Sequence, residues 1–249
     1  MILTINHNSN LLKVDLSRPM EISIPVQRKN SVSSFGINGA TYTDYVDGNF
    51  VGNKNKGGPC NLETITFTPH GNSTHTECLG HIAVGNQYYV NECIEDQFYN
   101  AKVITLSKTN NSEESPLDFS QVNFDEMANH TALIIRSLPN SPDRINHDYS
   151  GKNAPYITTS DMERIKDSGI KHLIIDLPSV DPEWDNGSLA AHHIFWNYPS
   201  NPRVDASITE FAFIPEYIAD GSYVLKLNIS PFESDAAPSR PVIYPIIAG

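Results

Sequence analysis

Residues 160–176, SDMERIKDSGIKHLIID, contain a helix signal followed directly by a strand signal. Ser160 can accept a hydrogen bond from the amide of Glu163, whose side chain can reach back to the Ser160 amide, and this capping box starts a helix. We expect Gly169 to end that helix, because glycine readily takes the left-handed conformation found after a helix C-terminus. The apolar run HLIID (172–176) has the length of a strand. A helix that leads straight into a strand is typical of a layered α/β arrangement.

Short stretches of strand length dominate the rest of the hydrophobic pattern. Some alternate apolar and polar side chains with the period of a half-buried strand, and the others are short apolar runs. The segments expected as strands are 11–16, 63–68 (ETITFT), 103–106, 132–135, 172–176 and 223–227 (YVLKL). A second helix is expected over residues 121–130. Because no repeat or linker interrupts the pattern, the sequence predicts a single strand-rich α/β domain over residues 1–249, with few helices.

The composition excludes several classes of partner. The chain has 249 residues, with 17 Lys and Arg against 29 Asp and Glu and a formal net charge of −12. Binding to nucleic acid depends on Lys and Arg that neutralise phosphates, so we expect no nucleic-acid partner. The three cysteines form no CxxC pair and do not suggest a disulfide framework. No run approaches eighteen apolar residues and no signal sequence is visible, so we expect a cytoplasmic protein without a membrane partner.

The stretch HGNSTHTECLGH (70–81) follows the expected strand ETITFT and concentrates side chains that bind metals or transfer protons. These are His70, His75, Glu77 and His81. Imidazole nitrogens and carboxylate oxygens suit zinc, manganese or iron, and a carboxylate can bridge two ions. A second interpretation stays open at this point, since nine histidines in the chain make a chance grouping common. Thr74 and Glu77 also fit a capping box, which would give Glu77 a structural role.

Further segments along the chain share a pattern with this stretch. They are Asp15-Leu16-Ser17, Asp176-Leu177-Pro178-Ser179-Val180-Asp181-Pro182, Ala191-His192, Glu210 and Ala236-Ala237-Pro238-Ser239-Arg240. Together with residues 70–81 they resemble the cyclase family of metal-dependent hydrolases, which includes bacterial kynurenine formamidase and isatin hydrolase. That family has the fingerprint HxGTHxDxPxH, preceded by DLS and followed by DxPSxDP, AH, a glutamate and SPxR. The resemblance spans nearly the whole chain, in order.

The chain departs from the family fingerprint at several positions. The differences are one additional residue between His70 and His75, Ser73 for a glycine, Glu77 for an aspartate, Leu79 for a proline, and Phe211-Ala212 for Asn-Leu after Glu210. Glutamate is one methylene longer than aspartate, so we hypothesise that the longer side chain and the additional residue compensate each other. The departures bear on the number of metal ions and on the substrate, and they indicate a distinct subgroup.

The resemblance implies a fold and a set of site residues. The fold would be a swivelling β/β/α arrangement. The implied metal ligands are His70 and His75 for a first ion, His192 for a second ion, and Glu77 and Glu210 for both. His81 would donate and accept protons. The ions would be divalent, zinc or manganese, with one or two of them in the site.

The same resemblance implies a reaction and a partner. The protein would hydrolyse a C–N bond of a small amide, formamide or lactam with an activated water, and it would form a homo-oligomer. Zinc lowers the pKa of bound water from about 15.7 to about 7, which makes water a competent nucleophile. The alternative is a metal-binding cyclase-like protein without hydrolytic turnover. The presence of His81 favours the enzyme, because a purely structural metal site needs no general acid or base.

Residues beside the motifs allow competing assignments. We prefer His192 over His193 as a ligand, by family position and because adjacent side chains diverge. Cys78 is expected to be buried and inert rather than a nucleophile. Asp176 and Asp181 could each orient a ligand histidine or could serve a turn or strand end, and the sequence leaves both interpretations open.

Overall fold

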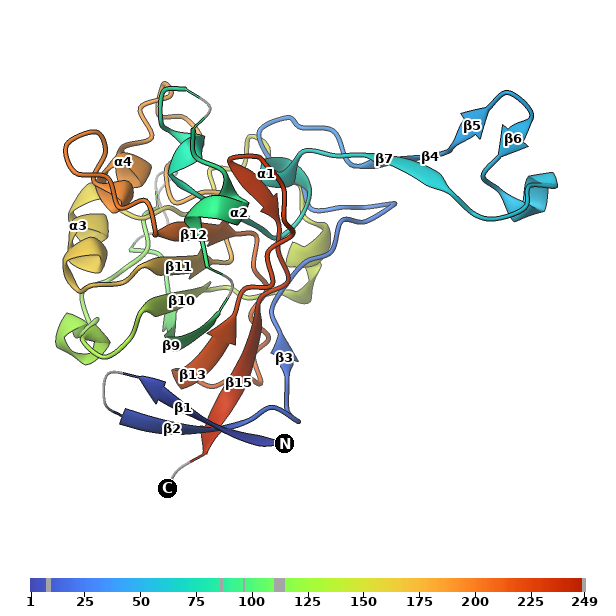
Figure 1. The fold of residues 1–249 in the computed structure, drawn as a ribbon. Coiled ribbons are helices and arrows are strands. Elements are labelled where there is room, and N and C mark those ends of the chain that lie inside the picture. The colour runs from blue at the N-terminus through green and yellow to red at the C-terminus, as the bar shows by residue number, and fades with distance from the viewer. Residues whose placement is uncertain (8–9, 86, 96, 110–114, 248–249) are drawn as a thin grey trace.

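Four parallel strands form the centre of the main sheet (Figure 1). The computed structural model describes residues 1–249 except 8–9, 86, 96, 110–114 and 248–249. The central strands are β9 (Phe98–Leu106), β10 (Ala132–Ser137), β11 (His172–Ile175) and β12 (Ser207–Glu210). Every residue of β10, β11 and β12 is buried. Parallel strands covered on both faces need continuous apolar runs, which explains the short apolar segments in the sequence.

Antiparallel strands extend the sheet on both sides. On one side the order is β13 (Gly221–Lys226), β15 (Val242–Ile247), β2 (Asn10–Asp15) and β1 (Ile2–His7), and β3 (Met20–Glu21) also pairs with β15. On the other side β8 (His75–Glu77) pairs with β12, and β14 (Ala236–Pro238) pairs with β8. Strand β8 therefore lies between two strands from the far end of the chain.

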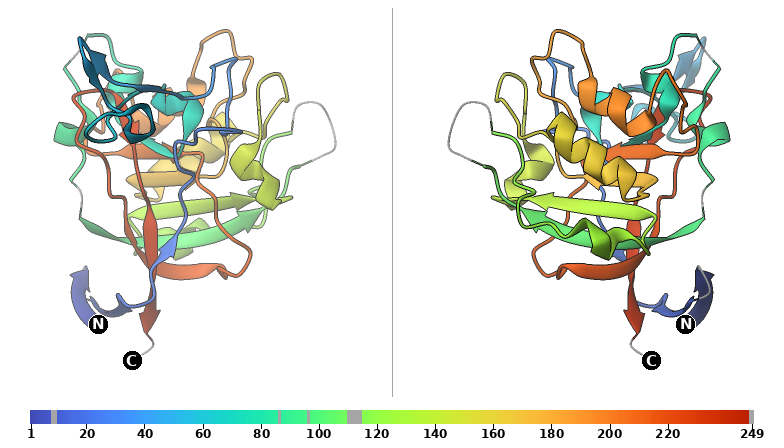
Figure 2. Two further views of the ribbon diagram at one scale, coloured as in Figure 1. Left: turned by 90° about the vertical axis from the view of Figure 1, so that its right-hand side faces the viewer. Right: turned by 90° about the vertical axis from the view of Figure 1, so that its left-hand side faces the viewer.

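Helical segments are few, and most are short. Two longer helices, α3 (Thr159–Asp167) and α4 (Ala190–Trp196), lie together over one face of the sheet (Figure 2, right). The short segments are α1 (Pro69–Asn72), α2 (Val90–Cys93), η1 (Lys54–Lys56), η2 (Leu79–His81), η3 (Phe124–Met127) and η4 (Pro142–Asn146). The expectation of a strand-rich α/β fold with few helices is confirmed. Within the described residues, no helix is long and apolar enough to span a bilayer.

The central strands divide two hydrophobic clusters. Leu133 and Ile135 of β10 belong to the cluster that includes residues of α3 and α4. Ala132 and Ile134 of the same strand belong to the other cluster, with residues of β9, β13 and β15. Successive side chains of a strand point to opposite faces, so one short strand supplies both clusters.

Of the two helices expected from the sequence, one is present in the structure and one is not. The helix at residues 160–168 is present as α3, but Thr158 rather than Ser160 is its N-cap, with the hydroxyl accepting from the Asp161 amide at 3.1 Å. Gly169 follows the helix with a φ of +89°, as expected. The helix predicted over 121–130 is wrong, since only η3 forms there. The Asn123 side chain caps η3 by accepting from the Asp125 amide, so the helical turn begins at Phe124 rather than at Gln121.

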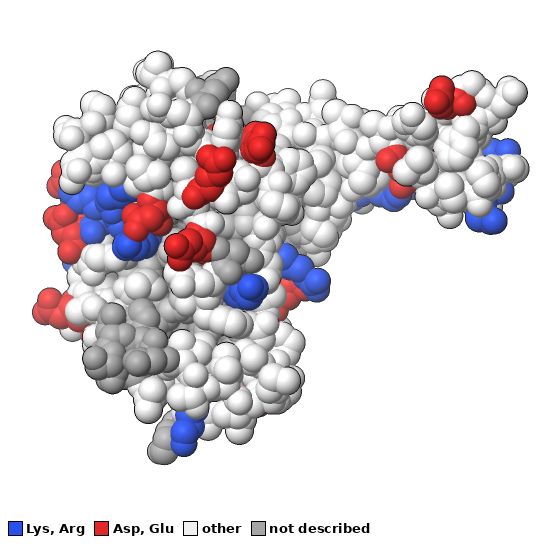
Figure 3. Space-filling model, viewed as in Figure 1, with Lys and Arg blue, Asp and Glu red and all other residues white. Residues whose placement is uncertain are grey.

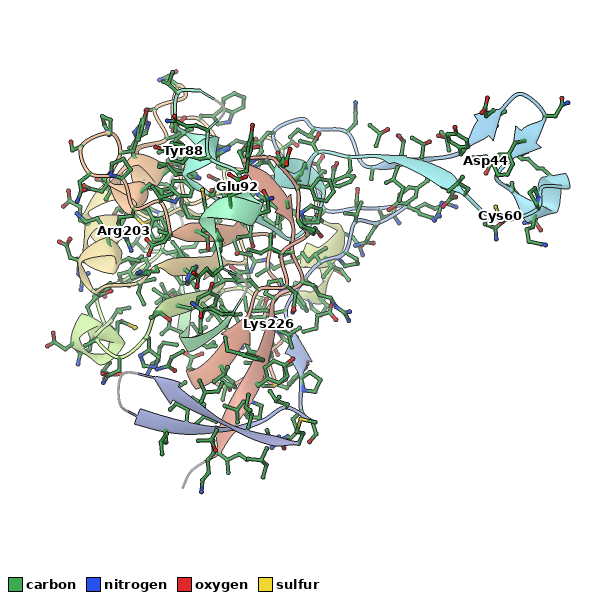
Figure 4. All side chains as sticks on the ribbon, viewed as in Figure 1. Asp44, Cys60, Tyr88, Glu92, Arg203 and Lys226 are labelled. Carbon is green, nitrogen blue, oxygen red and sulfur yellow. The ribbon has the colours of Figure 1, made fainter. Side chains whose placement is uncertain are left out.

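A two-stranded ribbon projects from the body (Figure 1). We call residues 40–68 the arm. It contains β4 (Thr41–Asp44) paired with β7 (Glu63–Thr66), then β5 (Val46–Asp47), β6 (Phe50–Val51) and η1. Asp44 and Cys60 lie far out on it (Figure 4). The strand expected at 63–68 is present as β7, but all its residues are exposed rather than half-buried, because its partner is β4 and it covers no core.

His172, at the start of β11, should make the fold sensitive to acid. Burial lowers the pKa of His172 to about 3, and its Nδ1 contacts Ser207 Oγ at 2.9 Å. The unfolded chain takes up this proton near pH 6.5, whereas the folded chain does not, so acid favours unfolding by about 1.4 kcal/mol per pH unit between pH 6.5 and 3.

We therefore expect His172→Gln to reduce the loss of unfolding free energy between pH 7 and pH 4.5 by about 2.5 kcal/mol. Urea unfolding at the two pH values measures this difference. The same loss in both proteins would contradict the assignment.

Candidate metal centre

Strand β8 carries two of the expected ligands on one face. His75 and Glu77 alternate with Thr76 along the strand, so they point to the same side. Thr76 points the other way and contacts Thr209 Oγ1 at 2.7 Å and Ser239 Oγ at 2.8 Å. These contacts tie β8 to both of its neighbours. The suggestion that Glu77 belongs to a capping box is wrong, because Glu77 lies in a paired strand rather than in the first turn of a helix.

Three other elements bring the remaining expected ligands to this face. His70 lies in α1, whose first residue is Pro69, a residue suited to the first turn of a helix. His192 lies in α4, and Glu210 ends β12 directly opposite His75 in the strand pairing. The short helix that follows the arm, the helical layer and the parallel strands thus meet at one point.

Two buried carboxylates stand between three imidazole rings. Glu77 Oε2 lies 3.2 Å from His70 Nδ1, and Glu77 Oε1 lies 3.1 Å from His192 Nε2. Glu210 Oε2 lies 3.5 Å from His75 Nε2, and Glu210 Oε1 lies 3.8 Å from His192 Nε2. The five residues predicted as metal ligands therefore form one cluster, and their role as ligands stays a prediction.

The outer nitrogen of each ring is held by a hydrogen-bond acceptor. His75 Nδ1 donates to Ser73 O at 3.1 Å, and His192 Nδ1 donates to Asp181 Oδ2 at 2.5 Å. His70 Nε2 donates to Asp235 Oδ2 at 2.9 Å. A proton on the outer nitrogen leaves the inner nitrogen of each ring to face the carboxylates. Such outer partners fix the tautomer and orientation of metal-binding histidines.

The electrostatics of the cluster fit a bound cation. Burial acts to raise the pKa of Glu77, but the charges of His81 and His192 outweigh it and hold the pKa well below its usual range. Burial acts to lower the pKa of His192, but Glu77 and Asp181 raise it to about 10. Protons can thus supply the positive charge that the carboxylates require, and a metal ion would displace those protons on binding.

Unpartnered polar atoms point to the same conclusion. His75 Nε2 and Glu77 Oε2 are buried and make no well-aligned hydrogen bond among the described residues, although Glu210 Oε2 and His70 Nδ1 lie 3.5 and 3.2 Å from them. Buried polar atoms normally have partners, so each such atom requires an explanation. Nitrogen and carboxylate donors in this number suit a divalent cation of the zinc or manganese type. Two groups of possible ligands share Glu77, one with His70 and His75, the other with His81 and His192.

His81 stands at the open side of the cluster. Its side chain is 26% exposed, whereas those of Glu77 and His192 are at most 2% exposed. Its ring stacks on that of His70 at 4.3 Å between centroids, and its Nε2 lies 3.9 Å from Glu77 Oε2. Gly80 is needed beside it, because a Cβ there would lie 2.3 Å from Tyr88 O. Tyr88 lies at this end of the body (Figure 4).

Asp235 is a member of the cluster that the sequence pattern did not identify. It directly precedes β14, and its Oδ2 accepts from both His70 Nε2 and His81 Nδ1, at 2.9 and 3.2 Å. The hydrogen bond from His70, followed by that from His81, holds the pKa of Asp235 far below its usual range. Its position next to the segment Ala236–Arg240 was the available signal, but that segment alone assigns it no role.

The structure also places the competing residues. His193 Nδ1 points to Tyr198 O at 3.4 Å, away from the cluster. Cys78 is buried, and its contact with Cys93 together with burial raises the pKa of its thiol, which agrees with an inert cysteine. Asp176 binds Arg144 Nη1 at 2.6 Å, whereas Asp181 binds the ligand candidate His192. Asp181 is therefore the aspartate that orients a cluster histidine.

The site combines imidazoles of fixed orientation with carboxylates shared between them, and it lies at the edge of a layered α/β sheet. This combination is typical of a metal-dependent hydrolase. A family model described as Putative cyclase matches residues 14–182, and the chain belongs to this family. The chain is similar to the kynurenine formamidase of Bacillus cereus, at 25% identity over 199 residues, which are 78% of this chain and 84% of that protein. It is also similar to the kynurenine formamidase of Bacillus anthracis, at 31% identity over 93 residues, which are 37% of this chain and 41% of that protein.

Solved structures share the fold. Isatin hydrolase A from Labrenzia aggregata has a TM-score of 0.60 at 12% identity, covering 91% of this chain and 93% of that one. A structure described as a predicted metal-dependent hydrolase from Bacillus stearothermophilus also has a TM-score of 0.60 at 12% identity, covering 91% of this chain and 98% of that one. At this identity the likeness concerns the fold alone.

Asp181 offers a test of the outer shell of the site. Asp181→Asn removes the charge that holds His192 Nδ1 but keeps an oxygen for the Ala191 amide, which donates to Asp181 Oδ1 at 2.8 Å. We expect zinc affinity to fall about 10- to 100-fold. Competition with a chromogenic chelator measures it. Asp185→Asn is the control, because Asp185 accepts from the Leu189 amide at 2.6 Å without touching a candidate ligand. Equal affinities in both variants would contradict this role.

Proposed function

We propose that the chain is a metal-dependent amidohydrolase that cleaves a C–N bond in a small amide, formamide or lactam. The observation that carries the proposal is the arrangement of Glu77 and Glu210, each shared between imidazoles whose inner nitrogens face them. The membership in the Putative cyclase family supports it. The similarity to kynurenine formamidase and the shared fold of isatin hydrolase support the substrate class.

The proposed ligand set follows the two halves of the cluster. His70 and His75 would hold a first divalent ion, His192 would hold a second, and Glu77 and Glu210 would be shared between them. Zinc or manganese suits these ligands. An ion so held would lower the pKa of water and polarise the carbonyl group under attack. The chain itself excludes water from the inner side, because Glu77, His75 and His192 are all buried.

His81 is the proposed proton donor and acceptor. Asp235 accepts from its Nδ1, so in the neutral ring the lone pair lies on Nε2, on the side of Glu77. That nitrogen can accept the proton released when water attacks and can then donate it to the leaving nitrogen. The alternative, a metal-binding protein without turnover, gives no reason for a partly exposed imidazole held in this orientation at the open side of the cluster.

His81→Ala separates proton transfer from metal binding. We expect turnover to fall at least about 100-fold with metal content unchanged, because positioned general acids and bases contribute about that much or more. Hydrolysis of N-formyl anilines, lactams and cyclic imides by zinc- or manganese-loaded protein gives turnover, and elemental analysis gives metal content. His193→Ala is the control, since His193 faces Tyr198. A parallel loss of metal and activity, or unchanged activity, would contradict the assignment.

The proposed partner of the arm is a second copy of this chain. The arm exposes apolar side chains at Tyr45, Val46, Leu62 and Ile65. A two-stranded ribbon is at best marginally stable alone in water, so it requires a surface to pack on. Its tip carries Lys54 and Lys56, the blue patch at its end in Figure 3, whereas the chain as a whole has a net charge of −12. Asp44 and Asp47 also lie in this part of the arm, and Lys56 Nζ binds Asp44 at 2.6 Å, so the exposed apolar side chains rather than the charges are what suit contact with another copy.

The double variant Val46→Asp with Ile65→Asp should convert a homo-oligomer to a monomer, because charge on both apolar positions opposes burial of the arm. Light scattering coupled to size exclusion measures the mass. Leu11→Asp, which alters an exposed leucine of the body, is the control. A monomeric parent protein, or a variant that keeps the parent's mass, would contradict the proposal.

A further inference from the structure

Asp235 links the outermost histidine of the cluster to the main sheet. We infer that Asp235 is a positioning residue that fixes the ring of His81 with its Nε2 turned toward the reacting groups. The inference rests on the proposed function, in which His81 transfers protons, and it assigns a role to a residue outside the family motifs.

The hydrogen-bond chemistry of a carboxylate determines the orientation. Asp235 Oδ2 lies 3.2 Å from His81 Nδ1 and 2.9 Å from His70 Nε2. An ionised carboxylate only accepts hydrogen bonds, so both of these ring nitrogens carry protons. The opposite nitrogens, His81 Nε2 and His70 Nδ1, consequently face Glu77 Oε2, at 3.9 and 3.2 Å. One oxygen thus sets the orientation of two rings.

Asp235 can do this because its own position is fixed. Ser234 Oγ donates to Asp235 Oδ1 at 3.0 Å, which orients the carboxylate. The main-chain oxygen of Asp235 accepts from the Cys78 amide at 2.9 Å, immediately after Glu77. The next residue, Ala236, pairs with Glu77 in the sheet. The carboxylate is therefore anchored to β8, the strand that carries Glu77. Because Asp235 in turn holds the ring of His81, strand pairing helps to set the position of that ring relative to Glu77.

The same geometry argues against two other roles. Asp235, His70 and His81 could in principle hold a metal ion together. However, Asp235 meets His70 at Nε2, the nitrogen that faces away from Glu77, and its side chain is 38% exposed whereas that of Glu77 is fully buried. A purely structural role would not require contact with His70 and His81, which at 21% and 26% exposed are more exposed than His75 and His192. Orientation of the two rings accounts for both contacts.

The first test is kinetic. With saturating zinc, Asp235→Ala should lower kcat about 10- to 100-fold, with metal content and KM close to those of the parent protein. Asp235→Glu, which keeps an acceptor, should restore part of the loss. Glu233→Ala, an exposed neighbour on the same segment, is the control. A loss of kcat explained entirely by lost zinc would overturn the inference.

A double-mutant cycle separates action through His81 from action through His70 or the fold. In the His81→Ala background, adding Asp235→Ala should change the residual kcat less than about twofold, because the residue that Asp235 positions is gone. If Asp235→Ala lowers the residual rate by the same factor as in the parent protein, Asp235 does not act through His81, and the inference is wrong.

A third measurement does not depend on turnover. Nitrogen-15 NMR of histidine side chains in the zinc-loaded protein should place the His81 proton on Nδ1 in the parent and Glu233→Ala proteins, and redistribute it in Asp235→Ala. A proton on Nε2 in the parent protein would overturn the inference. If the NMR result is as expected but none of the amides is hydrolysed, the proposed function fails while the orientation of His81 by Asp235 stands.

Discussion

The burial of two carboxylates in one small volume is the constraint on which the rest of the site depends. Glu77 and Glu210 are 0% and 3% exposed, and they lie within 4 Å of three and of two imidazole rings respectively. A buried, uncompensated carboxylate is strongly destabilising, so the fold must supply positive charge at this point. The three rings with fixed outer nitrogens do this through protons or through metal. The hydrogen-bond acceptors of these outer nitrogens are Ser73, Asp181 and Asp235. They contribute to the same charge balance because they determine which nitrogen of each ring faces the carboxylates.

The order of strands in the sheet brings the imidazole rings to the two buried carboxylates. Strand β8 precedes the parallel strands in the chain but is placed beyond β12 in the sheet, with β14 on its other side. Glu210 is thereby set opposite His75, and Asp235 is carried to the end of the same strand. Helix α4 then adds His192 from the layer above. Strands β8 and β14 are far from β12 and from each other along the chain, so the site exists only in the complete sheet.

The sequence predicted the parts of the site that lie in ordered motifs. His70, His75, Glu77, His192 and Glu210 fall within segments whose order along the chain matches a family pattern, and their convergence could be expected from it. Asp235 could not, because its role depends on which strand pairs with β8, and strand order has no local signature. Thr158 rather than Ser160 is the cap of α3. Three hydroxyl residues, Thr158, Thr159 and Ser160, stand in a row, and only the packing of α3 selects among them. The exposure of β7 could not be predicted from the sequence for a similar reason. Its alternating pattern fits a half-buried strand, and only the tertiary structure shows that it covers no core.

The arm leaves and rejoins the body at adjacent points, since Thr41 pairs with Thr66 at its base. The distance between the two ends of the arm is therefore the same for a short arm as for a long one. The entropy cost of closing a loop rises only slowly with its length. Insertion or deletion within residues 45–62 would leave the sheet and the metal-binding cluster unchanged. The length of this segment is thus independent of the fold that carries it, and it can vary with whatever surface the tip has to reach.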